Sequence, residues 1–246
     1  MISGSSGGMS FDAKMRLYAP EYLSFHQKLA PLLSAQNMRV VAQPVKPSIS
    51  WPDYTTSRMG DAAYLTSMKD DAQRDIALIG ENSAVLDLGT GTGHYLLELA
   101  SLAKQRGIHA SFTGVDIILP HFFEEAKINY ALAAQQMTSY TQQDIKNFAF
   151  EENSYTLINA PNVLYYLEVD DQIKIIEKIA SSLATGGVAR VRVKKDYENN
   201  DPLHHSLDDE AFFGLLDRLK DWHFFAAATY AFPDFPMIEI RKPPAR

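Results

Sequence analysis

The sequence predicts an α/β fold: a doubly wound, mostly parallel sheet of seven strands with an antiparallel C-terminal hairpin strand, preceded by an N-terminal helical cap. Two observations predict it. From Ser83 onward, short apolar runs alternate with stretches of helical periodicity, the pattern of a parallel sheet with right-handed crossovers. One apolar run, 84–88, enters a loop with Gly89, Gly91 and Gly93 and then a helix, which is how such sheets build a nucleotide site.

The apolar runs of the second part of the chain are short and bounded by glycine or polar residues, as strands are. The expected strands are 84–88, 111–116, 138–142, 155–160, 188–194, 223–231 and 236–241. No helical stretch separates the last two, and the segment 233–236, Pro-Asp-Phe-Pro, is typical of a turn. We therefore expect these two strands to form a hairpin.

Between the strands, apolar residues recur at helical spacing. The expected helices are 94–106, 120–136, 171–184 and 208–220. Gly107 follows the first where a C-cap glycine belongs, and Pro120 suits the first turn of the second. We expect Asp170 to N-cap the third helix, and Ser206 with Asp209 to form a capping box at the fourth.

The chain divides into three predicted parts. Residues 1–8 are rich in glycine and serine, and we expect them to be a leftover expression tag before a native start at Met9. Residues 9–80 are expected to form the helical cap, because helical periodicity flanks a proline-rich link. Residues 81–246 are expected to form the nucleotide-binding α/β domain.

Composition limits the partners. The net charge of −7 argues against nucleic-acid substrates, since a phosphate backbone is usually met by a basic face, and the one basic run is 190–195. No apolar run reaches the roughly 20 residues of a membrane span, and no leader peptide is evident, so a cytoplasmic protein with no membrane partner is expected. The chain has no cysteine, which excludes disulfides and thiolate metal sites, and no metal is expected.

The glycine loop separates the nucleotide classes. The dinucleotide fingerprint G-x-G-x-x-G would place its third glycine at His94, and a P-loop requires a lysine that residues 89–93 lack. Asp87, two residues before the first glycine, would repel a pyrophosphate at close range. A carboxylate there suits a ligand with a positive centre, and S-adenosyl-L-methionine (AdoMet) has two, an ammonium and a sulfonium.

In these features residues 83–241 resemble the class I AdoMet-dependent methyltransferases, whose fold is Rossmann-like. The resemblance depends on five segments in order: the glycine loop, 112–116, 142–145, 155–167 and 183–188. It implies an enzyme, a transferase, that takes AdoMet as cofactor and releases S-adenosyl-L-homocysteine.

The resemblance also implies which residues hold the cofactor. Asp87 and the glycine loop would meet its methionine part, Asp116 the two ribose hydroxyls, and Asp144 the adenine amino group, with 159–162 beside the reacting methyl. The full predicted set is Asp87, Gly89, Thr90, Gly91, Gly93, His94, Asp116, Ile117, Asp144, Ile145, Asn159, Ala160 and Asn162. Two alternatives stay open: Gln143 or Ile145 could lie against the base, and His94 could face solvent instead.

Four residues are candidates for proton transfer or for contact with the acceptor. His204 and His205 end a polar loop that leaves the carboxyl end of the expected strand 188–194; an exposed histidine pair is the alternative. Tyr54, in the proline-bent link, could form a lid over the site or clasp the cap onto the sheet. Tyr166 follows the strand 155–160, and either it or Tyr165 is expected to line the pocket.

The sequence thus predicts a methyltransferase acting on an N or O atom of a small organic molecule. The run 159–162, Asn-Ala-Pro-Asn, lacks the second proline and the aromatic residue of the N-P-P-Y signature, which is typical of methyltransferases that act on planar amino groups. This difference favours a small-molecule enzyme. A protein-side-chain methyltransferase and a non-catalytic AdoMet-binding module are the alternatives. An aminopropyl transferase is disfavoured, because it would need several acids lining a polyamine channel and the Asn-Ala-Pro-Asn run does not supply them. The acceptor and the oligomeric state stay open.

Overall fold

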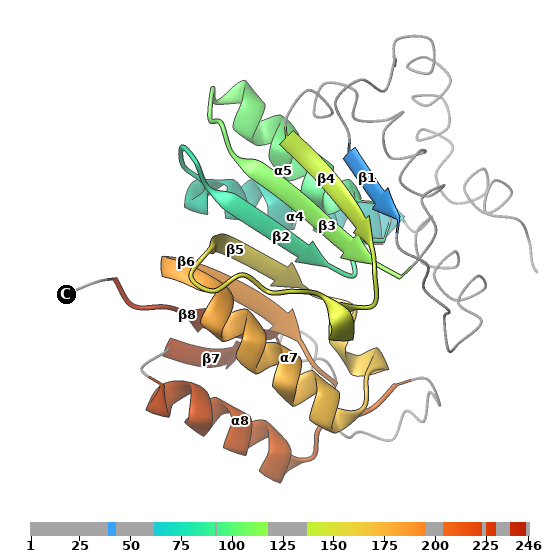
Figure 1. Cartoon of the computed structure of the whole chain (residues 1–246), viewed down its shortest axis with the longest axis vertical. Helices are drawn as coiled ribbons and strands as arrows, with labels where there is room; N and C mark the ends of the chain where they lie inside the picture. The colour runs from blue at the N-terminus through green and yellow to red at the C-terminus, as the bar shows by residue number, and fades with distance from the viewer. Residues whose placement is uncertain are drawn as a thin grey trace, which may run out of the picture.

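The computed structural model describes residues 39–42, 62–91, 93–117, 137–194, 204–222, 225–229 and 237–244. In this part of the chain an eight-stranded sheet lies between helices, with α4 and α5 on one face and α7 and α8 on the other (Figure 1). The predicted helix 120–136 lies outside the described residues.

The strands occur in the sheet in the order β1-β4-β3-β2-β5-β6-β8-β7. The first six run parallel, and β8 runs antiparallel to both of its neighbours. Their bounds are β1 Arg39–Ala42, β2 Ala84–Leu88, β3 Ser111–Asp116, β4 Met137–Gln142, β5 Tyr155–Ala160, β6 Leu183–Arg192, β7 Phe225–Thr229 and β8 Met237–Arg241. The strand order reverses between β2 and β5, which makes their carboxyl ends the expected place for a ligand.

Helices connect and cover these strands. Their bounds are α4 Ala62–Asp75, α5 His94–Gln105, α7 Val169–Ser182 and α8 Asp209–Asp221, with short 3₁₀ turns η2 Ile76–Leu78, η4 Ile145–Asn147 and η5 Leu164–Tyr166. None of the helices in the described ranges is both long and apolar enough to cross a membrane.

The mostly parallel α/β sheet with one antiparallel hairpin strand is confirmed, but the predicted number of seven strands is wrong. The eighth is β1, which pairs parallel to β4 from inside the predicted helical cap. Its four residues, Arg-Val-Val-Ala, are too short for periodicity to reveal. The expected strand 188–194 begins earlier, at Leu183, because the pairing with β5 shifts register around Gly186 and Gly187 and then continues.

The helix ends test the capping predictions. Gly107 has φ of +69°, and the amide of Ile108 donates to the carbonyl of Ala103 at 2.9 Å, so the glycine stop is confirmed. Asp170 is not an N-cap, because α7 begins at Val169 and places Asp170 in its first turn.

The capping box at α8 is also wrong. Asp208 is the N-cap, and its Oδ1 accepts from the amide of Ala211 at 2.8 Å. Ser206 lies outside the helix, and Asp209 is the first helical residue. An Asp side chain caps the amide three residues further on as well as a serine does, so sequence spacing alone did not separate the two.

Two cores lie on the two faces of the sheet. Leu86 of β2 and Ile158 of β5 pack under α7 and α8, whereas Val85 and Leu157 pack under α4 and α5. Because side chains alternate along a strand, Asp87 and Asn159 share the second face with Val85 and Leu157. Ala72 and Ile76 also belong to this second core, so the end of the predicted cap packs as part of the α/β domain.

Candidate active site at the carboxyl ends of the strands

The glycine loop joins β2 to α5 at the point where the strand order reverses. Its first amides are tied to the neighbouring strand: Gly89 N and Thr90 N both donate to the carbonyl of Val115, at 2.8 and 3.2 Å. Gly91 N donates to Asp116 Oδ2 at 2.8 Å. Asp116, which ends β3 and is buried, therefore holds the loop in place, a role that the sequence analysis did not foresee.

Two loop glycines are required by packing. Gly89 and Gly93 have φ of +68° and +76°, values that favour glycine. A Cβ on Gly89 would lie 2.5 Å from Cβ of Val163, and a Cβ on Gly93 would lie 2.5 Å from the hydroxyl of Tyr140. The loop thus packs tightly against Val163, which follows β5, and against Tyr140 of β4, and any side chain at these glycines would displace one of the two.

A polar row crosses the α4/α5 face of the sheet just before the strands end. In register from β4 to β8 it contains Tyr140, Gly114, Asp87, Asn159, Arg190 and Glu239. At its centre Asn159 Nδ2 donates to Asp87 Oδ1 at 3.0 Å, and both side chains are buried.

Asp87 lies in β2, one residue before the strand ends and the loop begins. Burial raises its pKa from 3.8 to about 7, and the neighbouring charge of Asp116 acts in the same direction. Near neutral pH the carboxyl and carboxylate forms are therefore close in free energy. A cation placed beside Asp87 would favour the carboxylate form.

The row continues into an ionic network that fixes the helices beneath the loop. Arg190 pairs with Asp75, the last residue of α4, and its Nε donates to Glu239 Oε2 at 3.0 Å. Tyr95, in the first turn of α5, donates its hydroxyl to Asp75 Oδ2 at 2.7 Å. Burial and the charge of Asp75 raise the pKa of Tyr95, which keeps this phenol protonated as a donor.

Glu239, at the far end of the row, is held as a carboxylate. Partial burial acts to raise its pKa, but hydrogen bonds from Arg241 and Arg190 outweigh burial and lower it overall. Sequence reasoning missed Asp75, Tyr95 and Glu239. The alternation of Arg190 and Arg192 along one strand was their only signal in the sequence, and it did not identify their partners.

The predicted adenine contacts have other roles in the described structure. Asp144 Oδ1 accepts from the amide of Lys146 at 2.9 Å and so caps the turn η4. The side chain of Ile145 is buried in the core under α7, which leaves its backbone to face a ligand. The side chain of Ala160 is buried in the same core. Ile117 follows β3, and its carbonyl accepts from Gln142 Nε2 at 3.4 Å.

Asn162 lies beyond the end of β5 at a junction of three elements. Its Oδ1 accepts from Arg192 Nη1 at 3.0 Å and from the hydroxyl of Tyr165 at 3.3 Å. Arg192 is the last residue of β6, and Tyr165 belongs to η5. The geometry thus brings the predicted methyl-side residue Asn162 next to a cation, which the sequence analysis did not predict.

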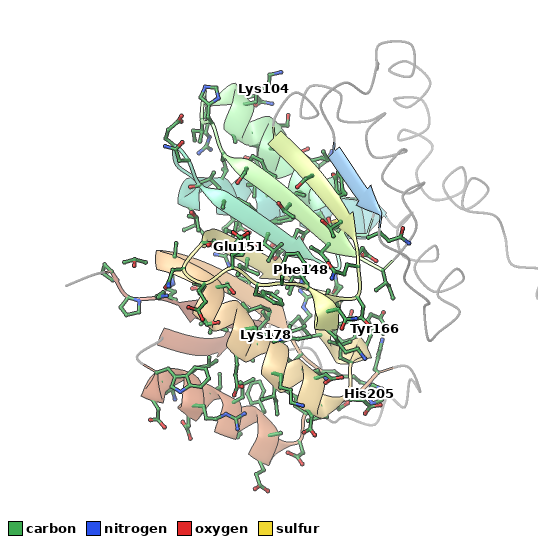
Figure 2. All side chains as sticks on the ribbon, viewed as in Figure 1. Lys104, Phe148, Glu151, Tyr166, Lys178 and His205 are labelled. Atoms are coloured by element: carbon green, nitrogen blue, oxygen red, sulfur yellow. The ribbon has the colours of Figure 1, made fainter. Side chains whose placement is uncertain are left out.

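Three of the proposed acceptor-side rings form one cluster. The ring of His204 packs against Tyr165 and Tyr166 at centroid distances of 4.7 and 4.9 Å. His205 Nδ1 lies 3.3 Å from Glu168 Oε2, and the amide of His205 donates to the carbonyl of Tyr165 at 2.7 Å. Figure 2 shows Tyr166 and His205 close together beside the start of α7.

Two predicted site residues cannot be placed in this cluster. Tyr54 lies outside the described residues. His94 begins α5, but its side chain also lies outside what the structure describes. Their roles stay predictions. Among the described residues, no three His, Asp or Glu side chains gather as a metal site would require.

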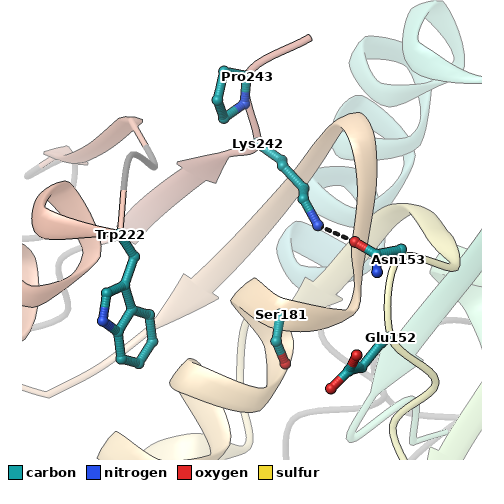
Figure 3. A pocket seen from close by; sticks show the side chains of 6 residues that line it. All are labelled: Glu152, Asn153, Ser181, Trp222, Lys242 and Pro243. Carbon is teal, nitrogen blue, oxygen red and sulfur yellow. Dashed lines mark hydrogen bonds between the residues drawn. The ribbon is translucent and has the colours of Figure 1, made fainter. Parts of the chain in front are cut away.

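A hollow of about 420 Å³ lies elsewhere, at the amino-terminal edge of the sheet (Figure 3). Lys242 follows the antiparallel strand β8 and bonds to Asn153, which precedes β5. The side chains that line it are Glu152, Asn153, Ser181, Trp222, Lys242 and Pro243. Since the glycine loop and the polar row lie toward the opposite ends of the strands, this hollow is separate from the candidate site.

Comparison with known proteins supports the predicted resemblance to methyltransferases. A family model described as a methyltransferase domain matches residues 85–187. The match covers less than half of the chain, so it is these residues that resemble a methyltransferase domain. The matched region begins in β2 and ends at the glycine turn in β6, so it contains the glycine loop, Asp87, Asp116 and Asn162. The predicted resemblance to class I AdoMet-dependent methyltransferases is confirmed.

A curated relative matches part of the chain. Carboxy-S-adenosyl-L-methionine synthase from Desulfotalea psychrophila is 30% identical over 109 residues, which are 44% of this chain and 42% of the relative. The match thus covers less than half of the relative's length.

Solved structures share the fold over most of the chain. N-methyltransferase NodS from Bradyrhizobium japonicum WM9, solved with S-adenosyl-L-homocysteine, has a TM-score of 0.56 at 19% identity, covering 90% of this chain and 98% of that one. Magnesium protoporphyrin IX methyltransferase from Synechocystis PCC 6803 has a TM-score of 0.54 at 14% identity, covering 93% and 97%. At these identities the likeness shows the fold.

Proposed function

We propose that this chain transfers the methyl group of AdoMet to an N or O atom of a small organic molecule. The observation that carries the proposal is the pair of buried carboxylates, Asp87 and Asp116, at the glycine loop. Two acids in this position favour a ligand with positive centres over a pyrophosphate. The methyltransferase domain match over 85–187 supports the same conclusion.

The residues present fit this cofactor. Asp116, already fixed against Gly91, would accept hydrogen bonds from the ribose hydroxyls, and Asp87, which accepts from Asn159, would compensate the charge of the methionine part. Bound AdoMet would supply an electrophilic methyl group with a neutral thioether as leaving group. What this chain must then do is align the acceptor and, for a protonated nucleophile, accept its proton.

His205 is the strongest candidate for that proton acceptor. Its Nδ1 faces Glu168 at 3.3 Å, an arrangement that orients the ring and leaves Nε2 as the acceptor nitrogen. The backbone of His205 is held from both sides, because its amide donates to Tyr165 and its carbonyl accepts from Gln172 Nε2 at 2.8 Å. Tyr166 and His204, whose rings pack against each other, would contact the acceptor.

Calorimetry tests the cofactor assignment. S-adenosyl-L-homocysteine should bind the wild-type protein, and Asp116→Ala should abolish detectable binding. Asp217→Asn, an exposed carboxylate on α8, is the matched control and should bind as the wild type does. Unchanged affinity in Asp116→Ala would refute the site. Release of S-adenosyl-L-homocysteine during turnover of a small-molecule panel then separates an enzyme from a protein that only binds AdoMet.

A second candidate is chemistry on the methyl carbon of AdoMet itself, favoured by the 30% identity to a carboxy-S-adenosyl-L-methionine synthase. Mass spectrometry of the nucleoside products distinguishes the two. Methyl transfer yields S-adenosyl-L-homocysteine and a methylated acceptor. Carboxylation needs a second substrate as carboxyl donor: the methyl carbon loses a proton, bonds to the donated carboxyl carbon and gives a heavier sulfonium nucleoside, with no homocysteine product.

A further inference from the structure

Asp75, the buried last residue of α4, ties this helix to the first turn of α5 and to the sheet. Its Oδ2 accepts from the hydroxyl of Tyr95 at 2.7 Å, and both side chains are buried. Its Oδ1 pairs with Arg190 of β6. These three side chains are not among the residues assigned to the cofactor, yet they lie directly beneath the glycine loop.

Tyr95 stands two residues after Gly93, where the glycine loop becomes α5. Loop and helix are bonded to each other, because Gly93 N donates to the carbonyl of Thr90 at 2.8 Å and Leu97 N donates to the carbonyl of Gly93 at 2.9 Å. Gly93 is the N-cap and has no side chain that could hold the free amides of the helix. The bond from Tyr95 to Asp75 therefore does what a capping side chain would do: it fixes the first turn of α5.

On its other side the network reaches the carboxylate assigned to the methionine part of the cofactor. Arg190 is opposite Asn159 in the sheet, and Asn159 Nδ2 donates to Asp87 Oδ1 at 3.0 Å. Burial raises the pKa of Tyr95 well above its usual range, and the charges of Asp75 and Asp87 act in the same direction, so the phenol is within electrostatic reach of both. The network thus runs along the base of the glycine loop, from α5 to Asp87.

We propose that Asp75 and Tyr95 are positioning residues for AdoMet, which hold the first turn of α5, and with it the glycine loop, in the conformation that binds the cofactor. The inference rests on the proposed function, because it takes the glycine loop as the cofactor site. The apparent affinity of a ligand falls in proportion to the fraction of molecules whose site is competent to bind. Loss of the bond between Tyr95 and Asp75 would let the loop populate other conformations and so would lower that fraction.

The test is a calorimetric titration of wild type and Tyr95→Phe with S-adenosyl-L-homocysteine. Phenylalanine keeps the ring and removes only the hydroxyl that Asp75 accepts from. The dissociation constant should rise about tenfold, which corresponds to about 1.4 kcal/mol, close to the net value of a hydrogen bond to a charged group.

Ile179→Val is the control that separates affinity from stability. Ile179 is buried in the core under α7 and α8, on the opposite face of the sheet from Tyr95, and the substitution deletes one methylene there. Urea denaturation should show a loss of stability similar to that of Tyr95→Phe, while the dissociation constant stays within about twofold of the wild-type value.

Hydrogen exchange followed by mass spectrometry adds a local measurement. In the cofactor-free protein, the peptide that contains the amides of Gly93 and Leu97 should exchange faster in Tyr95→Phe than in Ile179→Val. A role of Tyr95 in overall stability alone would raise exchange equally in the two variants.

Three results would overturn the inference and leave the proposed function standing. They are an unchanged dissociation constant in Tyr95→Phe, an equal weakening in Ile179→Val, and exchange at Gly93 and Leu97 that is the same in both variants. If the wild type does not bind S-adenosyl-L-homocysteine at all, the proposed function and this inference fail together.

Discussion

Replacing Asp87 by asparagine should make the protein more stable at neutral pH, and the gain should grow with pH. Asparagine has the shape of a neutral carboxyl group and keeps an oxygen that can accept from Asn159. It removes the ionisation that burial opposes. The substitution therefore isolates the cost of the charge from the loss of a contact.

The sign and size follow from the pKa of Asp87, which burial raises from 3.8 to about 7. Below pH 3.8 the group is neutral in both states and costs nothing. Between pH 3.8 and 7 the unfolded chain ionises while the folded one does not, so the folded state loses stability as pH rises. At 1.36 kcal/mol per pKa unit the full effect is about 4 kcal/mol, and about 3 kcal/mol of it develops between pH 5 and pH 8.

Urea denaturation at pH 5, 6, 7 and 8 measures this directly. The free energy of unfolding of Asp87→Asn minus that of the wild type should rise with pH by about 3 kcal/mol and level off above pH 7. Asp217→Asn, whose side chain is 74% exposed, is the control and should follow the wild-type curve within about 0.5 kcal/mol. A constant difference between Asp87→Asn and wild type across this pH range would refute a buried carboxyl with a raised pKa.

Four further outcomes are expected. AdoMet should bind the wild type more tightly as pH rises from 5.5 to 7, because a cation beside Asp87 favours its carboxylate form. Calorimetry in buffers of different ionisation enthalpy should detect proton release on binding. Binding that does not depend on pH would contradict a contact between AdoMet and Asp87. Gly93→Ala should lower the free energy of unfolding by about 1–3 kcal/mol in urea, since its Cβ meets the hydroxyl of Tyr140 in a left-handed backbone. Tyr95→Phe should lower the free energy of unfolding by about 1–2 kcal/mol in the same assay, because buried Asp75 loses a hydrogen-bond donor. Asp208→Ala should cost about 1 kcal/mol through the lost N-cap of α8, with S-adenosyl-L-homocysteine affinity unchanged by calorimetry; a matching loss of affinity would show that the cap also acts on the site.

The fold could be predicted from the sequence because its signals are local. The alternation of strands and helices, the glycine loop after β2 and the stop at Gly107 each depend on neighbouring residues, and the structure places them where predicted. The errors were local ambiguities: Asp208 instead of Ser206 at the start of α8, Asp170 in the first turn of α7 instead of at its N-cap, and a four-residue strand β1 hidden among helical patterns.

The sequence by itself determined the nucleotide-binding architecture and the acids at the strand ends, because strand termini and loop glycines are written in consecutive residues. Only the tertiary structure decided what those acids contact. Strand order and register bring Asp87 beside Asn159, Arg190 against Asp75 across 115 positions, and Arg192 against Asn162. Such pairings depend on the relative placement of whole strands and helices, which burial of the two cores sets and no local pattern encodes.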